Sequence, residues 1–257
     1  GVGKISVGPP YFDTVFVPLM APLVFLMGVG PLARWKEASI PDLARRLRWA
    51  AVVTLLAALG AGWAEGEIGW MSSLGLAMAF WIVTTLAVDL WERVRPAGGM
   101  RSSVWHRLRQ LPRAMVGMMV AHLGVAAFIL GVTIVNSYQV ERDVTMQVGD
   151  TTEIAGYTFT FRGVRDVQGP NYQAKRGTIE VTRGDRAIVT MQPEKRIYRV
   201  QNNPMTEAAI FSRITGDLYV SLGQPDDKGA WVVRVYYKPF VTWIWGGCAI
   251  MALGGLL

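Results

Sequence analysis

The chain of 257 residues is 51% hydrophobic and only 18% charged, with a formal net charge of +7. A soluble domain of this length carries roughly 25% charged residues, so the composition indicates that lipid solvates part of the chain. The single cysteine, Cys248, lies in an apolar run, which predicts a buried, unreactive thiol. One cysteine excludes a disulfide framework, a CxxC oxidoreductase and a c-type cytochrome.

Five segments are apolar enough for helices that cross a hydrocarbon core about 30 Å thick, which takes roughly 20 residues. In chain order they are Thr14–Ala33, Trp49–Trp63, Ile68–Leu90, Ala114–Val135 and Pro239–Leu257. The second is short, and we include it because the charges on either side fit the orientation described next. The fifth reaches the last residue, so we expect that it is cut short.

The loops between these segments predict the orientation of the chain. Basic residues fill the first and third loops: Arg34, Lys36, Arg45, Arg46 and Arg48, then Arg93, Arg95, Arg101, Arg107, Arg109 and Arg113. The second loop carries Glu65 and Glu67 instead. Because Lys and Arg in short loops mark the cytoplasmic side, the N-terminus is predicted outside. With so many of the 26 basic residues in two membrane loops, the net charge does not indicate a nucleic-acid partner.

Residues 136–238 have a different pattern. Apolar and polar residues alternate in Tyr157–Phe161 and Trp231–Tyr236, and Gly149-Asp150 and Gly184-Asp185 mark turns. A period of two between turn signals predicts an antiparallel sheet, sandwich or small barrel. The sequence therefore predicts three parts: a four-helix transmembrane region over 1–135, an extracytoplasmic β domain over 136–238, and a final transmembrane helix over 239–257.

His122 is the strongest candidate for a functional side chain. It lies eight residues into the fourth apolar segment, about 12 Å from the cytoplasmic end at 1.5 Å per residue. An ionisable group at that depth is costly, which favours a function. It could ligate a metal or haem, relay protons or donate a hydrogen bond, and a satisfied structural histidine is the alternative. Gly117, Gly124 and Gly131 form a smooth stripe that a helix or a flat ligand could approach.

The remaining candidates are weaker. His106 lies in a basic loop, where a solvated surface residue is expected. Trp243 and Trp245 open the last apolar segment, where an aromatic belt is expected at the membrane surface. The outer domain shows no catalytic constellation. Two segments of unusual composition, Pro193–Tyr198 and Pro204–Ile210, are expected to be loops or strand ends that dock a partner, or else a solvated edge.

Several of these segments together resemble the C-terminal part of the CcmF family, a membrane component of cytochrome c maturation in bacteria and plant mitochondria. The matching residues are Ile5-Ser6-Val7-Gly8-Pro9-Pro10-Tyr11-Phe12, Ala121-His122-Leu123-Gly124, Gly169-Pro170-Asn171-Tyr172, Pro193-Glu194-Lys195-Arg196, Pro204-Met205-Thr206-Glu207-Ala208-Ala209-Ile210, Asp217-Leu218-Tyr219-Val220 and Tyr237-Lys238-Pro239. They are distributed over essentially the whole chain, and several are too long to arise by chance.

The resemblance implies a component of the haem lyase that attaches haem covalently to apocytochrome c. It implies a b-type haem between two transmembrane histidines, with quinol as electron donor. By position, His122 matches the second of these histidines and is expected to be an axial ligand of the haem iron. The implied location is the bacterial inner membrane, with the β domain periplasmic, and the mitochondrial inner membrane is the alternative.

The implied partners are the N-terminal remainder of the same protein or a separate subunit, the haem chaperone CcmE, a CcmH-type subunit that handles apocytochrome, and apocytochrome c itself. Membrane lipid is expected and nucleic acid is not. The family's tryptophan-rich haem-handling loop, its two periplasmic histidines and its other transmembrane histidine have no match in this sequence. We therefore expect a piece of a larger or split protein that performs no ligation alone. The alternative is a transporter or assembly scaffold in which His122 relays protons or packs.

Overall fold

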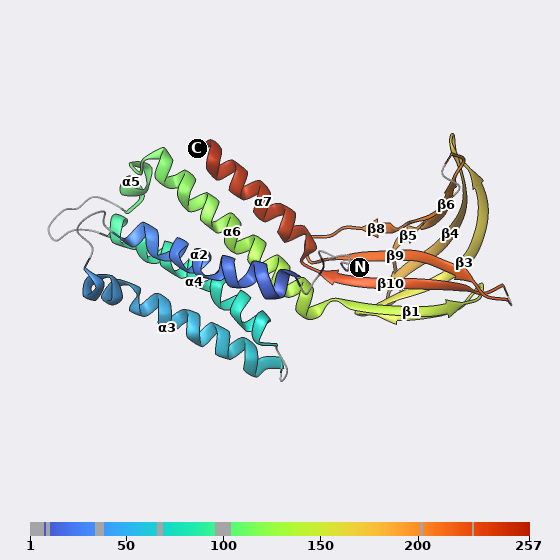
Figure 1. Cartoon of the computed structure of the whole chain (residues 1–257), viewed down its shortest axis with the longest axis horizontal. Helices are drawn as coiled ribbons and strands as arrows, with labels where there is room; N and C mark the ends of the chain where they lie inside the picture. The colour runs from blue at the N-terminus through green and yellow to red at the C-terminus, as the bar shows by residue number, and fades with distance from the viewer. Residues whose placement is uncertain are drawn as a thin grey trace, which may run out of the picture. The chain divides into compact units, whose positions relative to one another are not determined.

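The computed structural model describes residue 8 and residues 11–33, 39–65, 69–95, 104–200, 203–227 and 229–257. Most of the Ile5–Phe12 motif lies outside these residues, as do Arg34, Lys36, Glu67 and Arg101. The chain divides into two compact units (Figure 1). One comprises Gly1–Thr133 with Trp243–Leu257, and the other comprises Ile134–Thr242. We describe each unit by itself.

The first unit is helical. Its elements are η1 (Phe12–Phe16), α2 (Val17–Val29), η2 (Gly30–Leu32), α3 (Ile40–Glu65), α4 (Trp70–Val94), α5 (Val104–Arg109), α6 (Arg113–Tyr138) and α7 (Val241–Leu256). Among the described residues, three helical segments are long and apolar enough to cross a membrane: Phe12–Leu32, α4 and α6. Three predicted spans thus coincide with such segments. The segment Trp49–Trp63 lies within the longer helix α3, and α7 is a shorter apolar helix.

An apolar cluster joins α2, α4 and α6. Its buried members are Val24, Ile82, Leu86, Met119 and Ala126. On α2, the Phe25 ring stacks on the Trp81 ring of α4, with 5.0 Å between the ring centroids. The Trp81 Nε1–H donates to the Phe25 carbonyl oxygen at 2.9 Å, so the indole is buried without leaving its polar atom unpaired.

The glycine stripe of α6 packs against α7, and the two helices run side by side in Figure 1. A Cβ placed on Gly124 would lie 2.6 Å from the backbone nitrogen of Met251 and 2.7 Å from the carbonyl oxygen of Gly247. A Cβ on Gly117 would lie 2.5 Å from the carbonyl oxygen of Gly254. Of the two occupants that the sequence left open for this stripe, the structure shows the helix. Glycines on both helices permit this backbone contact.

The second unit consists of two antiparallel sheets. Its strands are β1 (Val140–Met146), β2 (Thr151–Ile154), β3 (Tyr157–Gln168), β4 (Tyr172–Arg183), β5 (Arg186–Met191), β6 (Glu194–Tyr198), β7 (Pro204–Glu207), β8 (Ala209–Phe211), β9 (Gly216–Pro225) and β10 (Trp231–Pro239). One sheet has the order β1-β10-β9-β8. The other has the order β2-β3-β4-β6-β7, with β5 also paired to β4. The prediction of an antiparallel β domain is confirmed.

Alternation along the strands builds the core of this unit. In β3, Tyr157, Phe159 and Phe161 are buried, while the threonines between them are partly exposed. Successive side chains of a strand point to opposite faces, so every second residue reaches the interior. After Phe161 the register with β4 shifts, and Gly163 adopts φ +112° there. A β-bulge at this point suits glycine, which tolerates a positive φ.

Candidate functional site

His122 lies in the interior of α6, between Arg113 and Tyr138, and is partly buried. Its Nδ1 is 2.8 Å from the carbonyl oxygen of Met118. A carbonyl oxygen only accepts hydrogen bonds, so Nδ1 carries the proton and donates. In the neutral ring the Nε2 atom then holds the lone pair, and within the described part of the chain no hydrogen bond to Nε2 is found. This tautomer is the one in which an imidazole can ligate a metal through Nε2.

The surroundings of His122 are apolar. Met118 and Ala126 lie four residues before and after it, so all three share one face of the helix. Both belong to the contact that α6 makes with α2 and α4 through Val24 and Ile82. The glycine stripe occupies a different face, because His122 follows Gly117 by five residues and is therefore turned roughly 140° from it. The stripe thus packs α7, and His122 faces the α2–α4 side.

The residues present fit one axial position of a haem iron. An unpaired Nε2 on a hydrogen-bonded imidazole in apolar surroundings matches what such a ligand requires. No group of three or more His, Cys, Asp or Glu side chains able to hold a metal ion occurs among the described residues.

Other predicted candidates have simpler roles. His106 on α5 is exposed, and its Nε2 lies 3.0 Å from Nε2 of Gln110, which confirms a surface residue. Trp245 is 71% exposed and Trp243 is 37% exposed near the start of α7. The prediction that Cys248 is buried is wrong, since this side chain is exposed on α7. An apolar run indicates a lipid-compatible segment, but it does not distinguish a helix face that packs on protein from one that faces outward.

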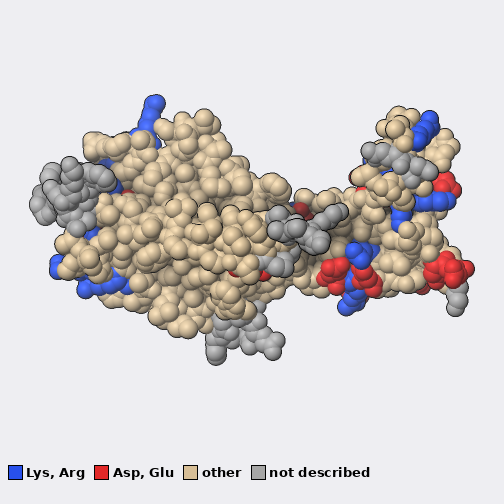
Figure 2. Space-filling model, in the orientation of Figure 1, with Lys and Arg blue, Asp and Glu red and all other residues tan. Residues whose placement is uncertain are grey.

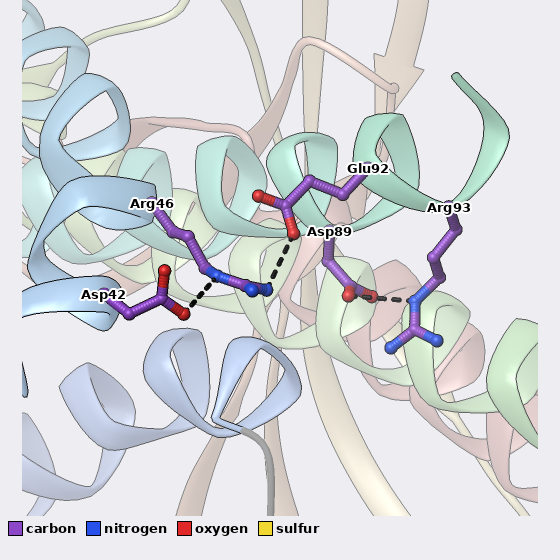
Figure 3. A network of polar contacts seen from close by, with 5 residues as sticks. All are labelled: Asp42, Arg46, Asp89, Glu92 and Arg93. Carbon is purple, nitrogen blue, oxygen red and sulfur yellow. Dashed lines mark hydrogen bonds and ion pairs between the residues drawn. The ribbon is translucent and has the colours of Figure 1, made fainter. Parts of the chain in front are cut away.

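Two ion-pair groups lie on α3 and α4 (Figure 3). Arg46 donates from Nε to Asp42 and from Nη1 to Glu92, each at 3.0 Å, and so joins the two helices. Asp89 accepts from Arg93 Nε at 2.9 Å through Oδ1. Its side chain is only 4% exposed. The predicted span ends at Leu90, whereas α4 continues to Val94, and the carboxylate of Asp89 is buried within this helix.

The segment Pro193–Tyr198 contributes an internal strand rather than a docking loop. As part of β6, Glu194 is 5% exposed and accepts hydrogen bonds from Arg176 and from Arg196, the latter at 2.6 Å. The Arg196 guanidinium lies 4.5 Å from the centroid of the Tyr172 ring. The prediction of a loop or solvated edge is therefore wrong for this segment. Its unusual composition reflects a buried carboxylate that needs two cations.

The segment Pro204–Ile210 connects the two sheets. It forms β7, the last strand in the order of the six-stranded sheet, and continues into β8, the last strand of the four-stranded sheet. Met205 is 47% exposed and Ile210 is 59% exposed. Edge strands with exposed apolar side chains can take up a partner, so the structure leaves this predicted docking segment accessible.

Replacing Glu194 by glutamine is expected to destabilise the protein by about 3 kcal/mol, because it leaves two guanidiniums beside an uncharged group. The side chains of Arg176 and Arg196 are 26% and 27% exposed. We therefore expect a loss of stability at the lower end of the range for breaking a buried ion pair. The matched control is Glu180→Gln, whose partner Arg162 is exposed and whose loss costs about 0–1 kcal/mol. Thermal denaturation of both variants measures the difference, and equal midpoints would contradict this account.

The pH dependence of the same pair has a definite sign. Burial opposes ionisation of Glu194, but hydrogen bonds from Arg196 and Arg176 outweigh it and lower the pKa of this carboxyl below the ordinary 4.5. Its contribution to stability is therefore present above pH 4.5 and is lost as the pH falls through the lowered pKa. We expect the stability gap between the parent chain and Glu194→Gln to close in that acidic range. A constant gap would be inconsistent with the ionised pair.

A family model matches nearly the same residues as the second structural unit, Ile134–Thr242. Residues 137–239 match a family model described as the CcmF C-terminal beta-sandwich. Over 254 residues the chain is 41% identical to the cytochrome c-type biogenesis protein CcmF of Pseudomonas aeruginosa, covering 99% of the chain and 38% of the relative. It is 43% identical to the protein of that name from Escherichia coli K12, covering 100% and 38%.

A solved structure called Cytochrome c Heme Lyase CcmF has a similar fold. Its TM-score is 0.78 at 24% identity, with 97% of this chain and 40% of that chain covered. At this identity the likeness shows the fold alone. The chain spans about two fifths of the length of the relatives that it matches.

Proposed function

Since the chain belongs to the CcmF family of cytochrome c-type biogenesis proteins and aligns with the C-terminal part of its members, we propose that it acts in cytochrome c maturation. In this role it is a component of the haem lyase that attaches haem covalently to apocytochrome c. It supplies His122 as one axial ligand of a membrane b-type haem, and the second ligand comes from an N-terminal part of the protein or from a separate subunit.

The observation that carries the proposal is the state of the His122 ring. Donation from Nδ1 to the Met118 carbonyl fixes the tautomer and leaves Nε2 as a lone-pair donor. The hydrogen bond also orients the ring and raises its basicity as a ligand. When bound, a b-type haem supplies electron transfer, with quinol as the proposed donor. Met119 and Ala126 are buried members of the apolar cluster on this side of α6, and apolar surroundings would tune the reduction potential of a haem held here.

The proposed orientation in the membrane follows the loop charges. In it, α2, α3, α4, α6 and α7 all span the bacterial inner membrane, and the N-terminus and the unit Ile134–Thr242 are periplasmic. Within the helical unit, the start of α3, the end of α4 and the start of α6 lie at the same end (Figure 1), which supports alternating directions. That end would be cytoplasmic.

Cysteine labelling tests this orientation. In a Cys248→Ser background, Asp185→Cys in the β4–β5 turn and Gln110→Cys after α5 each introduce one exposed thiol. A membrane-impermeant maleimide added to spheroplasts is expected to label the first variant at once and the second only after permeabilisation. The reverse pattern would invert the proposed topology.

The proposed partners are the haem chaperone CcmE, a CcmH-type subunit and apocytochrome c, which would meet the β unit on the periplasmic side. Met205 and Ile210 on the edge strands are the apolar side chains offered there. The variant Met205→Ser/Ile210→Ser should weaken co-purification of a partner, while Val148→Ser, which alters another exposed apolar residue, should not. If the partner co-purifies equally well with the first variant, these side chains of the edge strands take no part in docking.

The competing function is a transporter or assembly scaffold, in which His122 relays protons or only packs. Bound haem, measured by its spectrum, and substrate-dependent proton movement distinguish this function from the proposed one. The chain, fused to the N-terminal part of the Pseudomonas aeruginosa relative, is expected to give a b-type pyridine haemochrome spectrum after purification. A haem-free preparation that moves protons when a substrate is added would favour the transporter instead.

A further inference from the structure

A hollow of about 350 Å³ lies between α3 and α4, and its lining includes neither His122 nor any residue of the β unit. Its charged lining includes Arg45, Arg46, Arg48 and Arg95, with Glu92 as the acidic member. Arg46 is already engaged by Glu92 and Asp42. Among the described residues, the other three arginines form no ion pair, and the side chains that line the hollow carry more positive than negative charge.

Tryptophans border this charged hollow. Trp49 and Trp91 both line it and are 63% and 61% exposed. The Arg48 guanidinium lies 5.4 Å from the centre of the Trp49 ring. Indole rings at the boundary of apolar and polar surface are typical of the level of lipid headgroups.

An apolar surface continues from the hollow along α3. Val52, Leu55, Leu56 and Leu59 are between 45% and 63% exposed. Figure 2 shows that Lys and Arg gather at one end of the helical unit, while the visible surface beyond them is almost free of charge. A ligand that fits both parts has an anionic head beside the arginines and long apolar chains beside the leucines.

We propose that this hollow binds an anionic phospholipid, with its phosphate held by Arg45, Arg48 and Arg95 and its acyl chains along α3. Guanidinium groups bind phosphate oxygens through paired N–H donors, and basic pockets between membrane helices on the cytoplasmic side suit anionic lipid heads. The site rests on the proposed membrane location of these helices. It does not depend on haem binding by His122.

Native mass spectrometry of the chain in a neutral detergent tests the proposal. Phosphatidylglycerol is titrated against phosphatidylcholine with the same acyl chains, and inorganic phosphate is added alone in a third arm. We expect phosphatidylglycerol to bind at least about tenfold more tightly than phosphatidylcholine. Equal binding of the two lipids, or binding of free phosphate as tight as that of phosphatidylglycerol, would overturn the phospholipid assignment.

Variants then locate the site. Arg45→Gln/Arg48→Gln is expected to weaken phosphatidylglycerol binding by at least about tenfold. The matched control, Arg109→Gln/Arg113→Gln, removes the same charge from exposed positions around α5 and the start of α6 and should bind like the parent chain. Because Arg45 and Arg48 are exposed, we expect both double variants to fold. A single Arg95→Gln variant is a second test of the site and should also weaken phosphatidylglycerol binding. Equal weakening in the two double variants would mean that diffuse charge, rather than this hollow, holds the lipid.

Discussion

Replacement of His122 by alanine is expected to lower the haem content of the protein at least about tenfold. Removing only a group that hydrogen-bonds to a metal ligand already costs roughly 10–100-fold in metal affinity, and this substitution removes the ligand itself. The measurement is the pyridine haemochrome absorbance per mole of the chain fused to the N-terminal part of the Pseudomonas aeruginosa relative. Alanine removes the Nε2 lone pair and leaves the backbone of α6 unchanged. The carbonyl of Met118 then loses only a local donor.

The matched control for this prediction is His106→Ala. His106 is exposed on α5 and contacts Gln110, so its loss should leave the haem content at the parent level. Unfolding is monitored in parallel, since a half-buried histidine also contributes to packing. Full haem content in the His122→Ala protein would contradict axial ligation by this residue. A loss of haem shared equally by both variants would do the same.

Alanine is expected to destabilise the protein at two glycines of α7, but not at the glycine next to each of them. A Cβ on Gly247 would lie 2.6 Å from the backbone nitrogen of Phe128, and one on Gly254 would lie 2.5 Å from the carbonyl oxygen of Gly117. Backbone atoms cannot move aside as a flexible side chain can, so Gly247→Ala and Gly254→Ala should each cost about 1–3 kcal/mol.

The neighbouring positions serve as controls within the same two turns of α7. Nothing lies within 4 Å of a Cβ on Gly246 or on Gly255. There alanine should be neutral or should stabilise the helix by about 0.5–1 kcal/mol. Thermal denaturation of the four variants in one detergent gives the comparison. If all four shift alike, α7 does not pack on the glycine stripe.

Much of the helical unit could be predicted from composition because a long apolar run leaves few alternatives to a spanning helix. The limits of α4 and α6 agree with the apolar segments to within a few residues. Which face a residue occupies is harder to predict. The exposure of Cys248 and the pairing of Gly117 with Gly254 depend on which helices are neighbours, and hydropathy carries no such information.

The charged residues show the same limit. Arg45 and Arg48 indicated orientation from the sequence as residues of a predicted loop, whereas the structure places both on α3. Their convergence with Arg95 on one hollow requires the packing of α3 on α4. Glu194 and its two arginines are brought together by pairing of β4 with β6. The sequence could single out Pro193–Tyr198 as unusual, yet only the strand register shows that the Glu194 carboxylate is structural.

The most direct test of the central claim exchanges the proposed ligand rather than removing it. In the fused protein, His122→Met keeps a donor atom on the same face of α6 but replaces imidazole by thioether. If His122 ligates the iron, the low-spin spectrum should change and the reduction potential should rise, as it does when methionine replaces one histidine ligand. A spectrum and potential identical to those of the parent protein would show that the iron is bound elsewhere.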